Sequence, residues 1–142
     1  MTPQLLVSLA EMLSADPLTT DDVSSRIGPV VEDPGAPLPI VFRPTMAGVS
    51  DARLWRYPES GLPYVLKVEP SANHAPTVSD LETALGTSER VLTHRGRPDE
   101  VVFDPISRGT KWTVTAIAEL ESSHAAVATA RITSIRLRRD PV

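Results

Sequence analysis

The sequence predicts an α+β fold: two tandem units, each a helix followed by antiparallel strands, that form one sheet with helices packed on one face. Three observations carry this prediction. The chain has 142 residues, of which 41% are hydrophobic and 23% are charged, so it is long enough to bury a core as one domain. An internal repeat divides it into two halves. Within each half the hydrophobic period changes from that of a helix to that of strands.

The repeat consists of short matches that keep their order along the chain. The chain contains two Phe and two Trp, and the alignment places one of each in either half. We therefore expect residues 1–142 to form a single domain with pseudo-repeat halves 1–71 and 72–142. The matched segments are Leu18 to Gly28 with Pro76 to Gly86, Ile40 to Pro44 with Val101 to Pro105, and Trp55 with Trp112.

Three helices are expected, each with a recognisable start and stop. A first helix runs from Thr2 to Ala15, with Pro3 in its first turn and Asp16-Pro17 at its end. Each half then opens with a short helix between a threonine and a glycine, where an N-cap and a C-cap of these residue types belong. Acidic residues at the start of both short helices suit the helix dipole. The apolar stripe of the first helix comprises Leu5, Leu6, Leu9, Met12 and Leu13.

Two hairpins complete the predicted sheet, one in each half, and each pair of strands flanks a turn. In the second hairpin, the alternation of apolar residues with Trp112 identifies the buried face. By the repeat, we expect Trp55 to point inward and Leu54 and Arg56 to lie on the opposite face. The strand pairs are Ala52 to Tyr57 with Tyr64 to Glu69, and Lys111 to Glu121 with Ala125 to Arg138.

Both halves share a helix that ends in glycine, followed by strands that contain a tryptophan. The pattern LTTDDVSSRIG…LWRY, and less fully TVSDLETALG…KWTV, resembles the tandem helix-plus-sheet modules of the β-lactamase-inhibitor-protein superfamily and of the related small outer-membrane assembly lipoproteins. The resemblance covers most of the chain. It implies a protein that binds another protein through an exposed sheet face and its loops, without catalytic residues. Those relatives are exported and often carry disulfides or a lipidated cysteine, whereas this chain has no cysteine, so the resemblance does not identify the partner.

The sequence contains no motif for catalysis or for a cofactor. His74, His94 and His124 lie in turn-like segments, and none has a second ligand at helical spacing. The hydroxyl pairs Ser24-Ser25 and Ser122-Ser123 lack the elbow of a serine nucleophile, and there is no glycine-rich loop for phosphates. We therefore expect no catalytic residue, no metal and no cofactor, and a protein that is not an enzyme, although scattered catalytic residues need no motif.

Charge and cysteine content restrict the partners and the compartment. The 18 acidic and 14 basic side chains give a net charge of −4, the wrong sign for a general nucleic-acid binder. The longest apolar stretches are far shorter than the roughly 20 residues of a membrane helix. The absence of cysteine suits a reducing cytoplasm, and the first residues lack the basic region of a signal peptide. We expect a cytoplasmic protein with no nucleic-acid partner and no membrane partner.

Basic residues concentrate in the last predicted strand, RITSIRLRRD, where alternation aims Arg136 and Arg138 at the same side. Two interpretations stay open. Charge on an edge strand protects it from aggregation, and a basic stripe makes contacts with the carboxylates of an acidic partner. The candidate binding residues on the solvent face are Arg56, Lys67, Thr113, Thr115, Arg136 and Arg138.

Three functions follow from these observations. The leading hypothesis is a non-enzymatic protein-binding module, such as an inhibitor, an immunity-type protein or an adaptor, whose exposed sheet face or edge strand engages another protein with an acidic surface. The second is a structural or assembly subunit that forms a homodimer along its edge strand. The third is a small-ligand binder or an enzyme with a pocket between sheet and helices.

Overall fold

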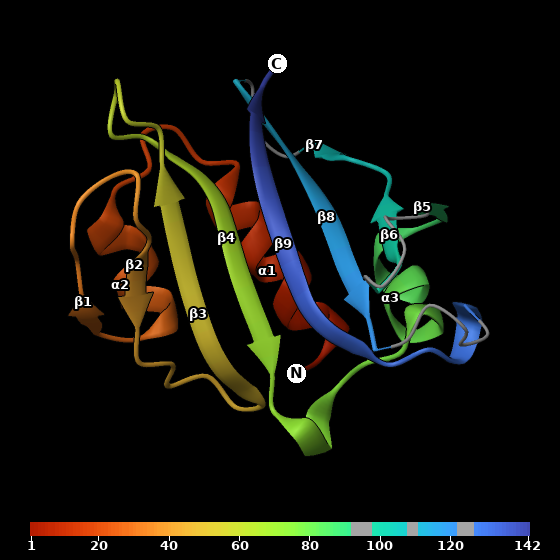
Figure 1. Cartoon of the computed structure of the whole chain (residues 1–142). Coiled ribbons are helices and arrows are strands. Elements are labelled where there is room, and N and C mark those ends of the chain that lie inside the picture. The colour runs from red at the N-terminus through yellow and green to blue at the C-terminus, as the bar shows by residue number, and fades with distance from the viewer. Residues whose placement is uncertain (92–97, 108–110, 122–126) are drawn as a thin grey trace.

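The described strands all belong to one antiparallel sheet, and the three α-helices lie on the same side of it (Figure 1). The structure, a computed structural model, describes residues 1–91, 98–107, 111–121 and 127–142. The predicted α+β fold, with helices packed on one face of a sheet, is therefore confirmed. The elements are α1 (Pro3–Leu13), α2 (Thr20–Ile27), β1 (Val30–Glu32), β2 (Ile40–Phe42), β3 (Val49–Arg56), β4 (Pro63–Pro70), η1 (Ala72–His74), α3 (Val78–Leu85), β5 (Ser88–Val91), β6 (Glu100–Phe103), β7 (Ile106–Ser107), β8 (Trp112–Leu120), η2 (Val127–Thr129) and β9 (Ile132–Pro141).

The two halves of the chain contribute to opposite ends of the sheet. Its strands are ordered β1-β2-β3-β4-β9-β8-β6-β5, and β7 pairs with β8. After α1, the first half continues with α2 and then β1 to β4, while the second half has α3 followed by β5 to β9. The order of a helix followed by strands is thus the same in both halves.

Helix α1 forms where the sequence predicts the first helix. The Thr2 hydroxyl caps it by accepting a hydrogen bond from the Leu5 amide at 3.3 Å, and Pro3 occupies the first turn. The helix ends at Leu13 rather than at Ala15. It packs against α3 and β8. Its buried residues are Leu6, Leu9, Ala10 and Leu13.

Helices α2 and α3 begin with the same device, a capping box. The Thr19 hydroxyl accepts from the Asp22 amide at 3.2 Å, and the Asp22 carboxylate accepts from the Thr19 amide at 2.9 Å. Thr77 and Asp80 repeat both bonds, at 3.2 and 3.0 Å. Each box satisfies backbone donors that a helix leaves free at its start. The backbone bond from Thr19 also lowers the pKa of the Asp22 carboxyl, because it stabilises the charged form.

The glycine after each of these helices has positive φ, but outside the αL region that the sequence predicts. Gly28 has φ 143° and ψ 175°, and Gly86 has φ 90° and ψ −163°. The Arg43 amide donates to the Pro29 carbonyl at 2.8 Å, which draws the two segments together. A Cβ at position 28 would overlap the Arg43 carbonyl oxygen, so only glycine fits there.

The last strand of each half lies in the middle of the sheet. Strand β9 pairs with β4 on one side and with β8 on the other, so the expectation that the C-terminal strand is an edge strand protected by charge is wrong. The physical reason is apolar burial: Leu66 and Val68 of β4 lie opposite Leu137 and Ile135 of β9, and all four are buried. Strands β1 and β5 form the edges.

The second hairpin also differs from its prediction at the start of the returning strand. We expected that strand to begin at Ala125, which lies outside the described residues, but β9 begins at Ile132 and residues 127–129 form η2. Just before β9, Arg131 forms an isolated bridge with Thr77. The chain is therefore held against the start of α3 before it enters the sheet.

The two tryptophans lie on opposite sides of the sheet. Trp112 lies on the helix-covered side of β8, as expected, because its alternate neighbours in the strand are buried. In β3, however, Ala52 and Leu54 are fully buried, and Trp55 lies opposite Val65 on the other side. The prediction that Trp55 points inward and Leu54 outward is therefore wrong.

Strand register explains this error. In the matched segments, Val41 pairs with Arg53 and Val102 pairs with Ile117. Arg53 is thus the counterpart of Ile117, and the counterpart of Trp55 lies near the end of β8, far from the tryptophan that begins that strand. Matching the two tryptophans is wrong, whereas the equivalence of the two halves in three dimensions stays a prediction.

One buried arginine joins α1 to the end of the sheet. Arg139 is 1% exposed. Its Nε donates to the Leu13 carbonyl at 2.7 Å and its Nη2 to the Ala15 carbonyl at 2.8 Å, so it caps the C-terminal end of α1, where a cation is favoured. The guanidinium lies 3.7 Å from the centroid of the Trp112 ring. Burial lowers the pKa of Arg139, and the charge of Asp16 opposes that shift.

Arg139→Met is expected to lower the free energy of unfolding by about 3 kcal/mol, because buried carbonyl oxygens lose hydrogen bonds to a charged donor. Arg138→Met is the matched control: it removes the neighbouring arginine, which lies half-exposed on the other side of β9, and is expected to change stability by about 0.5 kcal/mol or less. Urea denaturation measures both. Equal losses in the two variants would contradict the role of Arg139.

Asp22→Asn is expected to destabilise the protein in a pH-dependent manner. A lowered carboxyl pKa means that the charged group stabilises the folded state above its ordinary pKa, and that this stabilisation is lost as the pH falls through the folded-state pKa. The difference in urea midpoint between wild type and variant is therefore expected to be largest near neutral pH and to disappear as the pH falls through the lowered pKa of Asp22. A difference that is the same at every pH would contradict a role for the carboxylate charge in the capping box.

Candidate functional site

Among the described residues, no α-helix lies on the side of the sheet away from α1, α2 and α3, and we call this side the open face (Figure 1). Alternate residues of β3, β4, β9 and β8 form its centre, while the residues between them are largely buried in the core. On this face Arg53 lies directly opposite Lys67, and Lys67 lies directly opposite Arg136. We call these three cations the basic row. Arg138 lies two residues further along β9 on the same face.

A row of carboxylates runs beside the basic row. Asp51 lies opposite Glu69, and Glu119 lies opposite Glu100; we call these four the acidic row. Each cation of the basic row contacts one of these carboxylates, so the open face carries two rows of opposite charge rather than the simple basic stripe expected from the sequence. The ion pairs of the face are Arg53 with Asp51 (3.0 Å), Lys67 with Glu69 (3.7 Å), Arg136 with Glu100, and Arg138 with Asp140 (2.8 Å).

The open face brings together five of the six residues that the sequence analysis selected. Their registers place them on one side of β4, β8 and β9. Thr115 lies opposite Arg138 but is only 5% exposed, so it supports the face more than it contacts solvent. The five residues are Lys67, Thr113, Thr115, Arg136 and Arg138.

Arg56 does not belong to this group. Alternation in β3 places it on the side of Leu54, and its guanidinium donates to Asp33, in the loop after β1, at 2.7 Å. The expectation that Arg56 lies on the same face as the other five residues is wrong, because it depended on an inward Trp55. The same inversion hid Arg53, the central cation of β3, although its alternation with buried neighbours was a signal that could have identified it.

A shallow hollow of about 400 Å³ extends the open face toward β5. Thr115 and Arg138 line it together with Val102, Glu89 and Asp104. One cation, two carboxylates and a buried hydroxyl do not favour a single class of small ligand. We therefore treat this hollow as a depression in a larger interaction surface and not as a site for a small ligand.

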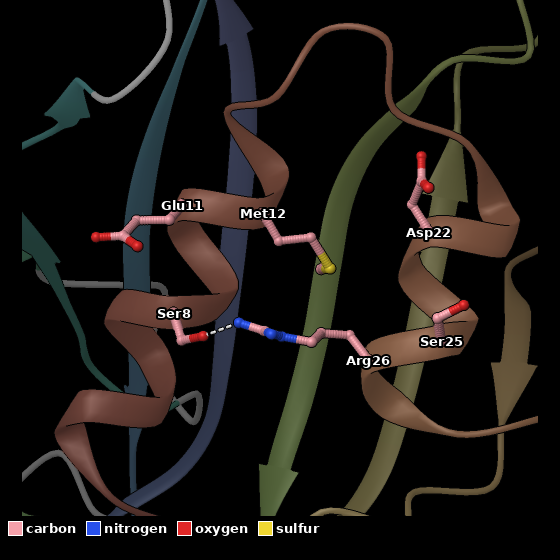
Figure 2. A pocket seen from close by; sticks show the side chains of 6 residues that line it. All are labelled: Ser8, Glu11, Met12, Asp22, Ser25 and Arg26. Atoms are coloured by element: carbon pink, nitrogen blue, oxygen red, sulfur yellow. Dashed lines mark hydrogen bonds between the residues drawn. The ribbon is translucent and has the colours of Figure 1, made fainter.

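A second hollow, of about 540 Å³, lies between α1 and α2 on the helix side of the molecule (Figure 2). Arg26 of α2 reaches across it and donates to the Ser8 hydroxyl of α1, and Met12 also lines it. Asp22, on the α2 wall, is held in the capping box. This hollow lies between two helices, whereas the sequence hypothesis of a small-ligand site placed its pocket between sheet and helices.

Of the three histidines in the sequence, His74 belongs to the described residues. His74 lies in η1, where its backbone carbonyl accepts a hydrogen bond from the Met1 ammonium at 2.9 Å; His94 and His124 lie outside the described residues. Within the described ranges, no cluster of three or more histidine and acidic side chains has a geometry that could hold a metal ion. None of the described helices combines the length and the apolar character needed to cross a membrane.

Comparison with known proteins gives no function for this chain, so a functional assignment depends on the open face. No protein-family model, no curated protein and no solved structure matches this chain at a significant level. The resemblance to the β-lactamase-inhibitor-protein modules therefore stays a prediction. The geometry and charge of the open face carry the argument that follows.

Lys67→Met is expected to leave the free energy of unfolding unchanged or to raise it by about 0.5 kcal/mol. Lys67 lies between Arg53 and Arg136, and like charges directly opposite one another destabilise antiparallel strands, whereas its exposed contact with Glu69 contributes little. Because salt screens the repulsion, added NaCl is expected to stabilise the wild type more than the variant. Urea denaturation at low and high salt measures both effects. A loss of more than about 1 kcal/mol in the variant would show that the basic row holds the sheet together.

Proposed function

We propose that the protein is a non-enzymatic protein-binding module, of the inhibitor, immunity or adaptor type, whose open face engages a protein that presents acidic side chains to the basic row. The observation that carries this proposal is the basic row itself, three cations directly opposite one another on adjacent strands. Such a row works against the stability of a sheet. Departures of this kind from local stability rules are expected at functional sites.

Apolar side chains around the basic row support a protein partner. Val41 and Ile117 lie in register with the row on either side of it. Trp55 lies opposite Val65, which in turn lies opposite Arg138. The four apolar residues are all partly exposed. Partly exposed aromatic and aliphatic side chains next to arginine are typical of residues that dominate protein interfaces.

The charge pattern of the face suits binding better than acid–base chemistry. The carboxylates Asp51, Glu69 and Glu100 each form an ion pair with a lysine or an arginine of the same face. The chain as a whole carries a net charge of −4, which favours a protein over a nucleic acid as partner. We assign this binding to the cytoplasm because the chain has no cysteine.

Affinity capture from the native cell extract tests the proposal with two variants of equal charge change. The open-face variant combines Lys67→Gln with Arg138→Gln. The control combines Arg26→Gln, on α2, with Arg43→Gln, on an exposed residue after β2. For the protein that the wild type captures, the open-face variant is expected to associate at least roughly tenfold more slowly at low salt and with a weaker salt dependence.

The control variant is expected to associate at the wild-type rate. If both variants bind the captured protein as the wild type does, the open face is not the binding surface. If both lose binding to the same extent, the effect is one of net charge, and the open face has no special role.

A further inference from the structure

We infer that the open face binds a second copy of this chain, face to face. This inference rests on the proposed function, because it names a partner for the same surface. The acidic row lies two residues along the strands from the basic row, a separation of roughly 6.7 Å. That separation is shorter than the Debye length of about 8 Å at physiological salt. A uniformly acidic surface would therefore be attracted by one row and repelled by the other.

A second copy presents the complementary pattern through symmetry alone. A two-fold axis that lies between the two rows, perpendicular to the strands and midway between the copies, keeps β3 over β3 and β4 over β4 but exchanges the rows. Arg53 of one copy then faces Asp51 of the other, and Lys67 faces Glu69. Each contact occurs twice in such an isologous interface. The rotation therefore pairs opposite charges on β3 and β4, while on β9 and β8 it brings Arg136 over Ser134 and Glu119 over Ile117.

The cations of the face have hydrogen-bonding capacity for a second carboxylate. Arg53 donates to Asp51 through Nε, and Arg138 donates to Asp140 through Nε. A guanidinium carries five donors in a planar fork, and each of these contacts through Nε uses one of them. The side chains of Arg53, Arg136 and Arg138 are 46%, 43% and 49% exposed, which leaves them accessible to a facing copy.

The size of the face also fits a dimer. Its four central strands are 8 to 10 residues long, so about four rows on four strands overlap, an area of roughly 27 by 19 Å. This corresponds to roughly 510 Å² per copy and about 1,000 Å² in total, at the lower end of the range of specific interfaces. Stacked sheets pack about 10 Å apart with their strands within about 30° of parallel. Exposed ion pairs contribute little individually, so we expect a weak dimer that salt dissociates.

Sedimentation equilibrium of the purified chain tests the inference without any other protein present. At a concentration of about 0.1 mM and roughly 20 mM NaCl, the weight-average mass is expected to approach twice that of the monomer, and to fall toward the monomer at roughly 500 mM NaCl. A single-row variant, Arg53→Glu with Lys67→Glu, replaces two of the three cations of the basic row with carboxylates and leaves Arg136 in place. We expect it to stay monomeric at both salt concentrations.

A row-exchanged variant provides the decisive control. It combines Asp51→Arg and Arg53→Asp with Lys67→Glu and Glu69→Lys, and it preserves the net charge and the ion pairs within the chain. The same rotation again brings opposite charges together, so this variant is expected to dimerise with itself. It is not expected to join the wild type, because basic side chains would then face basic side chains. Fluorescence anisotropy of labelled wild type, titrated with either unlabelled chain, measures this discrimination.

Three results would overturn the inference: a wild type that is monomeric at low salt, a single-row variant that still dimerises, or a row-exchanged chain that joins the wild type as readily as itself. The capture experiment with Lys67→Gln and Arg138→Gln is scored on a different protein. Face-dependent capture by a monomeric wild type therefore refutes the dimer alone, whereas capture that is insensitive to the open-face variant refutes the proposed function alone.

Discussion

The guanidinium of Arg139 joins the helical layer and the sheet at one buried point. It binds the carbonyls that end α1, contacts the Pro63 carbonyl at the start of β4 at 3.4 Å, and stacks on Trp112 at the start of β8. A buried charge is tolerated only when its hydrogen-bonding groups are satisfied. Segments from the beginning, the middle and the end of the chain must therefore come together at once. The side of the sheet that α1 covers, and so the side that stays open, depends on this contact.

The same arginine also fixes the register on which the open face depends. Side chains alternate along a strand, so a slip of β9 by one residue would move Arg138 into the core and Arg139 into solvent. Because only Arg139 finds carbonyl partners and an aromatic ring in the core, the observed register is strongly favoured. That register aligns Arg136 with Lys67 and thereby forms the basic row. A buried contact near one end of the sheet thus determines the charge pattern on its opposite surface.

Local signals predicted the elements well, because caps, turns and alternation act over a few residues. The threonine caps of α2 and α3 and the buried side of β8 all follow from such signals. These local signals failed in β3, where Leu54 and Trp55 are adjacent and either could be buried. Assigning the larger side chain to the core exchanged the two faces of the strand, so Arg53 was not recognised as a residue of the open face. Strand neighbours are a property of the whole fold, so no local pattern could place β9 at the centre or show that Arg53, Lys67 and Arg136 form one row. The burial of Arg139 depends on α1, more than 100 positions away, and was equally invisible.

The central place of β9 has a consequence for how the chain is made. Ribosomes deliver a protein from its N-terminal end, so no strand can join β4 to β8 until residues 132–141 emerge. During that interval β4 and β8 each expose a long backbone edge, which is a template for pairing with foreign strands. Closing a sheet through contacts so distant in sequence is intrinsically slow. A nascent chain stalled before Ile132 therefore carries two unpaired strand edges that can bind other chains. Strands β4 and β8 are the ones that a chaperone has to shield.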